Sequence, residues 1–94
     1  MTDDTAPMKE GQQTSLGIAQ RGFRGLIGAI VVDADHNGIP AVEIERRLLE
    51  LGFVEGATVE VLHEGPVGRD PIAVRVNNTT IALRRREAMA ILVT

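Results

Sequence analysis

This chain contains 94 residues, of which 44% are hydrophobic, and it has a formal net charge of −3 and no cysteine. A chain of this length forms one small domain, and the lack of cysteine excludes disulfides and thiolate zinc sites. The negative charge argues against a nucleic-acid partner, because such binding depends on attraction to phosphates. The longest apolar run, residues 25–32, is far shorter than the roughly 20 residues of a membrane-spanning helix. We therefore expect a chain that is not embedded in a membrane, with the cytoplasm as its location.

The first residues are acidic and polar, and they lack the basic and apolar regions of a signal peptide. We predict a disordered leader over residues 1–15 and a single folded domain over residues 16–94. β-branched and small residues predominate over residues 24–32, which predicts a first strand with a bulge at Gly28.

The clearest helix in the sequence spans residues 40–52, PAVEIERRLLELG. Pro40 suits the first turn of a helix, and Gly52 stands where a left-handed C-cap belongs. One side of the helix is apolar and is expected to face the core, through Ile44, Leu48 and Leu51. The opposite side is charged and is expected to face water, through Glu43, Arg46, Arg47 and Glu50.

Gly56 is expected to turn the chain into a region where the hydrophobic period is two. This period predicts three half-buried strands, over residues 58–61, 72–76 and 81–84. Asn77 and Asn78 are predicted to form a two-residue turn, since asparagine tolerates a positive φ angle. The longer connection is HEGPVGRDP, residues 63–71, which we predict to be an exposed loop.

The C-terminal segment is predicted to hold a short helical turn over residues 85–89 and a last strand over residues 90–93. Five short strands in so small a domain need protected edges, and closure into a barrel provides that protection. We therefore predict a mainly β fold, a small five-stranded SH3-like barrel. Its one amphipathic helix is expected between the first and second strands, against an open end of the barrel. The basic run RRR, residues 84–86, is interpreted as solvated surface, because no aromatic residue lies nearby to stack on bases.

Residues 33–38, DADHNG, begin like a calcium loop of the EF-hand type. Asp33, Asp35, Asn37 and Gly38 fill the first positions of such a loop. The twelfth position, which requires a bidentate glutamate, falls on Ile44. The pattern therefore favours a polar turn that joins a strand to a helix.

Three segments carry a recognisable combination of motifs: RRLLELGFVEGATVEVL at residues 46–62, GPVGRDPIAVRV at 65–76 and IALRRREAMAILV at 81–93. Together they resemble the FeoA family, the small SH3-like proteins of bacterial ferrous-iron uptake. The resemblance runs from about residue 25 to the end of the sequence and includes Gly52 and Gly56 as structural turn glycines. One departure is Arg69, an apparent extra residue in the loop.

The resemblance implies a protein without catalysis that binds a FeoB-type ferrous-iron permease at its cytoplasmic face. We consider two surfaces for that contact, the predicted loop and the charged side of the helix. The loop residues are Pro66, Val67, Gly68, Arg69 and Asp70. The helix residues are Glu43, Arg46, Arg47 and Glu50.

Two alternatives stay open from the sequence. One is direct binding of ferrous iron or another divalent metal, as a carrier or a metal-responsive switch, since oxygen and imidazole ligands suit such ions. The candidate ligands are Asp33, Asp35 and His36, or His63 with Glu64 and Asp70. The other is a detached SH3-like module of the kind that ends some metal-dependent repressors. No other cofactor is expected, and no enzyme is predicted, because no spacing of hydroxyl, histidine and carboxylate residues supports a catalytic site.

Overall fold

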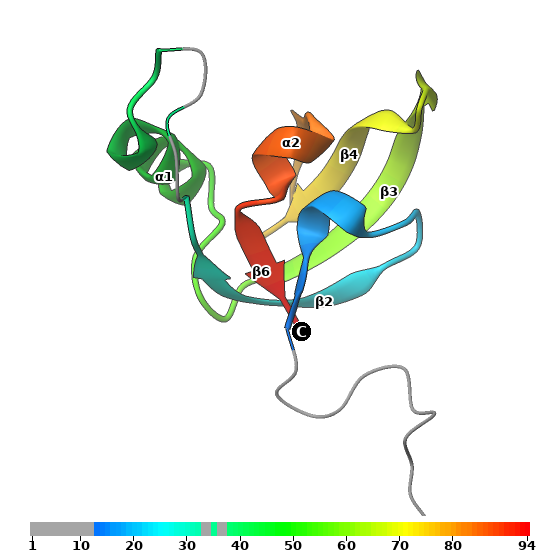
Figure 1. The fold of residues 1–94 in the computed structure, drawn as a ribbon. Helices are drawn as coiled ribbons and strands as arrows, with labels where there is room; N and C mark the ends of the chain where they lie inside the picture. The colour runs from blue at the N-terminus through cyan, green and yellow to red at the C-terminus, as the bar shows by residue number, and fades with distance from the viewer. Residues whose placement is uncertain (1–12, 33–34, 36–37) are drawn as a thin grey trace, which may run out of the picture.

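Figure 1 shows the computed structural model, which describes residues 13–32, 35 and 38–94. Its elements are, in chain order, β1 (Thr14–Ser15), the 3-10 turn η1 (Leu16–Ile18), β2 (Arg24–Ile30), α1 (Ala41–Glu50), β3 (Thr58–Val67), β4 (Asp70–Val76), β5 (Thr79–Leu83), α2 (Arg85–Ala88) and β6 (Ile91–Val93). Within these residues all paired strands are antiparallel, in the order β1-β6-β2-β3-β4-β5. The sheet curls into a small barrel, and α1 lies to one side of it.

Strand β2 joins the two parts of the barrel, because it pairs with two different neighbours. Residues 24–26 pair with β3, and residues 27–30 pair with β6. The register shifts between Ile27 and Ala29, so the strand bends where it passes from one neighbour to the other. The bulge predicted at Gly28 is thereby confirmed.

The predicted β-barrel with one amphipathic helix is confirmed, but it has one strand more than expected. Thr14 and Ser15 form β1 and pair with Val93 and Leu92 of β6. These two residues had been assigned to the leader, and residues 1–12 lie outside the described part of the chain. A two-residue strand is too short to show a hydrophobic period, which explains why the sequence pattern missed it.

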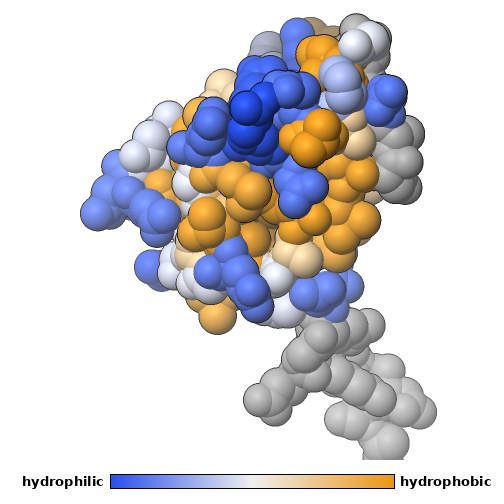
Figure 2. Space-filling view, turned by 90° about the vertical axis from the view of Figure 1, so that its left-hand side faces the viewer, coloured by the Kyte–Doolittle hydropathy of each residue, from blue (hydrophilic) through white to orange (hydrophobic). Residues whose placement is uncertain are grey.

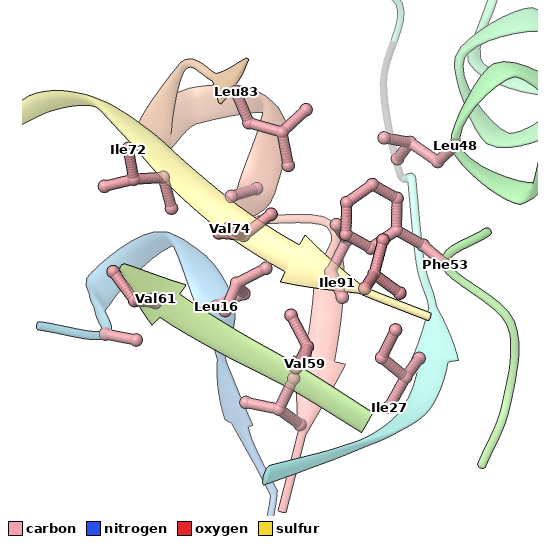
Figure 3. Close-up of a cluster of buried hydrophobic side chains, with 14 of the residues drawn as sticks. Leu16, Ile27, Leu48, Phe53, Val59, Val61, Ile72, Val74, Leu83 and Ile91 are labelled. Carbon is pink, nitrogen blue, oxygen red and sulfur yellow. The ribbon is translucent and has the colours of Figure 1, made fainter. Parts of the chain in front are cut away.

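The buried core of the described residues is wholly apolar. It consists of Leu16, Ala19, Ile27, Leu48, Phe53, Ala57, Val59, Val61, Ile72, Val74, Val76, Leu83, Ala88, Ile91 and Val93. Figure 3 shows Phe53, which is fully buried, among the aliphatic side chains of the barrel strands. The sequence has only two phenylalanines and no tyrosine or tryptophan, so β-branched and leucine side chains fill the rest of the core.

Helix α1 lies within the predicted segment, residues 40–52, and is shorter than predicted at both ends. Pro40 is its N-cap, and Leu51 is its C-cap. Gly52 follows with a φ angle of 109°, a left-handed conformation that a residue with a Cβ rarely adopts. Gly56, in the next turn, has a φ angle of 87°. No helix within the described segments is long and apolar enough to cross a membrane.

The apolar side of α1 packs on the barrel less completely than predicted. Leu48 is 3% exposed and lies beside Phe53 in Figure 3, and Ile44 packs at the edge of the core. Leu51 keeps 37% of its surface exposed, so its prediction as a core residue was wrong. The reason is that the chain turns at Gly52 directly after it, and Phe53 occupies the core position instead.

Residues 63–71 were predicted to be an exposed loop, and this prediction was wrong. They form the ends of β3 and β4 and the turn between them. β3 extends to Val67 and β4 begins at Asp70, so only Gly68 and Arg69 form the turn, with φ angles of 66° and 60°. Two register shifts interrupt the pairing of β3 with β4, and such bulges break the period of two by which a strand is recognised. The turn predicted at Asn77 and Asn78 is confirmed, with φ angles of 50° and 69°.

Gly65→Ala is expected to destabilise this hairpin. An added Cβ would meet the carbonyl group of Asp70 and lie 2.9 Å from the nitrogen of Pro71. Overpacking of this kind costs about 1–3 kcal/mol in the free energy of unfolding, which urea denaturation measures. Gly68→Asn is the control, because nothing lies within 4 Å of the corresponding Cβ and asparagine tolerates a positive φ angle. Equal losses in both variants would contradict the steric explanation.

Candidate functional site

A groove lies between α1 and the part of the barrel that carries α2 and the residues directly before β6, and its volume is about 680 Å³. Its apolar lining consists of Val31, Val32, Ile39, Ile44, Leu48, Leu51, Leu83, Met89 and Ala90. Several of these side chains are exposed, from 37% for Leu51 to 55% for Val31. Figure 2 views the molecule from the side on which α1 lies and shows apolar side chains gathered there among hydrophilic ones. Grooves lined by exposed apolar side chains are common places for a partner or ligand to bind, which makes this groove the candidate site.

Charged side chains also line the groove. They are Glu43, Arg46, Arg47, Glu50, Arg86 and Glu87. All four charged helix residues that the sequence singled out are among them, so the side of α1 that was predicted to face water is also a wall of the groove. Glu43 and Arg46 form an ion pair, but both side chains are at least half exposed and the pair adds little to stability.

The second predicted surface, residues 66–70, lies at the tip of the β3–β4 hairpin. In Figure 1 this tip and α1 lie on opposite sides of the barrel. Val67 exposes 80% of its surface, Pro66, Gly68 and Arg69 are also exposed, and Asp70 is partly buried. The structure therefore keeps the two predicted surfaces apart and does not combine them into one site.

Arg85, the first residue of α2, fastens the hairpin to η1. Its Nε donates to the carbonyl oxygen of Arg69 at 2.8 Å, and its Nη2 donates to a carboxylate oxygen of Glu64 at 2.8 Å. Its Nη1 donates to the carbonyl oxygens of Gly17 and Ala19, at 3.1 and 2.7 Å. A guanidinium has several donors in a fixed planar arrangement, which lets one side chain bridge these segments.

The interpretation of residues 84–86 as solvated surface was therefore wrong for Arg85. Its side chain is 19% exposed, as is that of Glu64, whereas Arg84 and Arg86 are exposed as expected. The backbone N–H of Arg85 also donates to Oδ1 of Asp70 at 2.9 Å. Both the side chain and the backbone of Arg85 thus bind the hairpin.

Among the predicted metal ligands, Asp35 has a structural contact. Its Oδ1 accepts a hydrogen bond from the backbone N–H of Ala41, at 2.9 Å, where α1 begins. The N–H groups of a first helical turn have no partner within the helix, so a carboxylate acceptor stabilises them. Asp33 and His36 lie outside the described residues.

The second predicted ligand group does not form a cluster. His63 is exposed on β3, whereas Glu64 and Asp70 accept hydrogen bonds from Arg85. Across the segments that the structure describes, no three histidine, aspartate or glutamate side chains come together in a way that could hold a metal ion.

Several residues of these surfaces were not predicted. Val31 and Ile39, from the connection between β2 and α1, and Met89, at the end of α2, line the groove, yet they share no local pattern. Arg85 lies in a run of three arginines, and no local signal distinguishes it from its neighbours. Only the folded chain brings these residues to their partners.

The fold is that of a small SH3-like barrel, as comparison with solved structures shows. A FeoA from Stenotrophomonas maltophilia complexed with zinc, described as a prokaryotic SH3 domain protein, is 34% identical. It superposes with a TM-score of 0.68, over 86% of this chain and 89% of that chain. A manganese-dependent transcriptional repressor, at 21% identity, shares the fold with a TM-score of 0.67, over 87% of this chain and 41% of the repressor.

The FeoA domain family matches residues 15–94, and the chain belongs to this family. The resemblance seen in the sequence is thereby confirmed. A stretch of 63 residues, 67% of the chain, is 35% identical to the Fe(2+) transport protein A/Fe(2+) transporter FeoB fusion protein of Porphyromonas gingivalis. The chain spans 7% of the length of that relative.

Asp35→Ala is expected to destabilise the start of α1, because the N–H of Ala41 then loses its acceptor. Loss of a capping acceptor typically costs about 0.5–2 kcal/mol, which thermal unfolding followed by circular dichroism measures. Asp35→Asn keeps an oxygen acceptor and is expected to lose less. If the alanine and asparagine variants were equally stable, the hydrogen bond would not be what holds the helix start.

Proposed function

We propose that this protein is an accessory regulatory protein of bacterial ferrous-iron uptake that binds a FeoB-type permease at its cytoplasmic face. The observation that carries the proposal is the relative from Porphyromonas gingivalis, whose name joins an Fe(2+) transport protein A to a FeoB transporter in one polypeptide. Fusion keeps two domains at a high effective concentration, which favours direct contact between them. Contact between this domain and a FeoB-type permease is therefore the function that the relative supports.

The groove beside α1 is the surface that suits this contact best. Burial of apolar surface contributes about 25 cal/mol per Å², and exposed side chains such as Val31 and Met89 offer such surface. Apolar grooves of this kind accept a helical or extended segment of a partner protein. The charged side chains at the rim would orient that segment, because charge complementarity determines specificity more than affinity.

The proposal assigns no catalytic step to the chain. Direct metal binding stays a prediction from the sequence, because two of its proposed ligands, Asp33 and His36, lie outside the described residues and the others form no cluster. Only the shared fold supports the repressor-like alternative.

Val31→Glu is expected to weaken binding to the soluble cytoplasmic domain of the FeoB-type permease from the same organism. A carboxylate would enter the groove at a position where an apolar side chain is 55% exposed. Central apolar contacts in an interface are worth more than about 1 kcal/mol, so we expect the Kd to rise about tenfold or more. A backbone-amide NMR titration of the full chain with that domain measures the Kd and locates the contact.

Val42→Glu is the matched control, because Val42 lies on α1 with 69% of its surface exposed but does not line the groove. Its Kd is expected to equal that of the unmodified protein. The absence of saturable shifts in the unmodified protein would contradict the proposed function. Equal Kd values for both glutamate variants would instead remove the groove from the interaction.

A further inference from the structure

The tip of the β3–β4 hairpin extends beyond the apolar core. The last buried residue of β3 is Val61 and the first buried residue of β4 is Ile72, so no buried side chain lies between them. A hairpin tip without buried apolar contacts is normally among the first parts of a domain to open locally. Something other than the core must therefore hold residues 66–69 in place.

The strand pairing that closes at Val67 and Asp70 is one support, and the Arg85 side chain supplies another. It binds the tip itself through the carbonyl oxygen of Arg69, and it binds the stem through the carboxylate of Glu64. Its remaining contacts are the carbonyl oxygens of Gly17 and Ala19, which belong to a different part of the chain. The guanidinium thereby ties the hairpin to η1, whose Leu16 is fully buried in the core. The hairpin tip is therefore connected, through Arg85, to a segment that is itself fixed in the core.

The geometry of these contacts requires an arginine. Three carbonyl oxygens and a carboxylate accept from three different nitrogen atoms of one planar group. A lysine ammonium carries the same charge on a single nitrogen, and it cannot reach acceptors on several sides at once. Arg85→Lys thus removes the geometry and keeps the charge.

The tip that is held in this way presents two side chains suited to a protein contact. Val67 is 80% exposed at the end of β3, and the exposed Arg69 lies two residues later, in the turn itself. An exposed apolar side chain and a cation on the same hairpin tip are complementary to an apolar pocket with a carboxylate at its edge. A contact that is already ordered binds more tightly, because less conformational entropy is lost on association.

We infer that Arg85 is a positioning residue that holds the hairpin tip as a preformed second contact, through Val67 and Arg69, for the partner bound by the groove. This inference rests on the proposed function and adds to it a second surface on the other side of the barrel. The complementary partner surface is an apolar pocket flanked by an acidic group.

The positioning role is tested by amide hydrogen exchange on the full chain, without any partner. Arg85→Lys is expected to speed the exchange of the amides of Val67 and Asp70, which pair across the turn, about tenfold or more, because the hydrogen bonds from the charged guanidinium to the hairpin are lost. Exchange at the buried strands, such as Val59 and Val74, is expected to stay as it is. The matched control is Arg75→Lys on β4, an exposed arginine away from the tip. Unchanged exchange at the tip in Arg85→Lys would overturn the positioning role.

The contact role is tested by titration with the same soluble permease domain. Val67→Asp is expected to raise the Kd about tenfold or more while its urea midpoint stays unchanged, because the side chain packs little. Arg85→Lys is expected to raise the Kd as well, although it touches no partner, and Arg75→Lys is expected to leave it unchanged.

The outcomes separate the inference from the proposed function. If Val67→Asp bound like the unmodified protein while Val31→Glu did not, the tip contact would be overturned and the proposed function would stand. If the unmodified protein did not bind, both the proposed function and the tip contact would be overturned. The hydrogen-exchange result would still decide whether Arg85 positions the tip.

Discussion

The bend of β2 at Gly28 is the constraint on which the other parts of the barrel depend. The first half of this strand pairs with β3, which continues into the hairpin, and the second half pairs with β6, which follows α2. A straight strand could pair with both neighbours, but the sheet would then stay flat and would not curl into a barrel. The bulge therefore sets the orientation of both the hairpin and the groove relative to a common core.

Local signals were sufficient to predict most of the fold. The α1 boundaries follow from Pro40 and Gly52, and the turn at Asn77 and Asn78 follows from the tolerance of asparagine for positive φ angles. Alternation identified the central strands, but it failed for the hairpin tip, where two bulges hide the period, and for β1, which has two residues. β1 exists only through pairing with the distant β6, and at the tip the bulged pairing of two adjacent strands determines the conformation.

The candidate site was predictable only in part, for a related reason. The charged residues of α1 could be chosen from one helical face, and they do line the groove. The apolar residues opposite them come from the segment after β2 and from the end of α2, and the contacts of Arg85 reach residues up to 68 positions away. Residues that come together from such distant segments leave no periodic pattern in the sequence. The short helix α2 connects the two surfaces, since Arg85 at its start binds the hairpin and Met89 at its end lines the groove.

The position of Phe53 gives this protein an internal spectroscopic reporter. The sequence contains no tryptophan or tyrosine, so its benzene rings are those of Phe23 and Phe53, beside the imidazole rings of His36 and His63. Leu48 of α1 lies beside the buried ring of Phe53, as Figure 3 shows. The ring current of that phenylalanine must therefore displace the methyl resonances of Leu48 from their usual positions. Those signals report whether α1 is seated on the barrel, and because the chain has no indole, the tryptophan fluorescence of any partner can be followed without background.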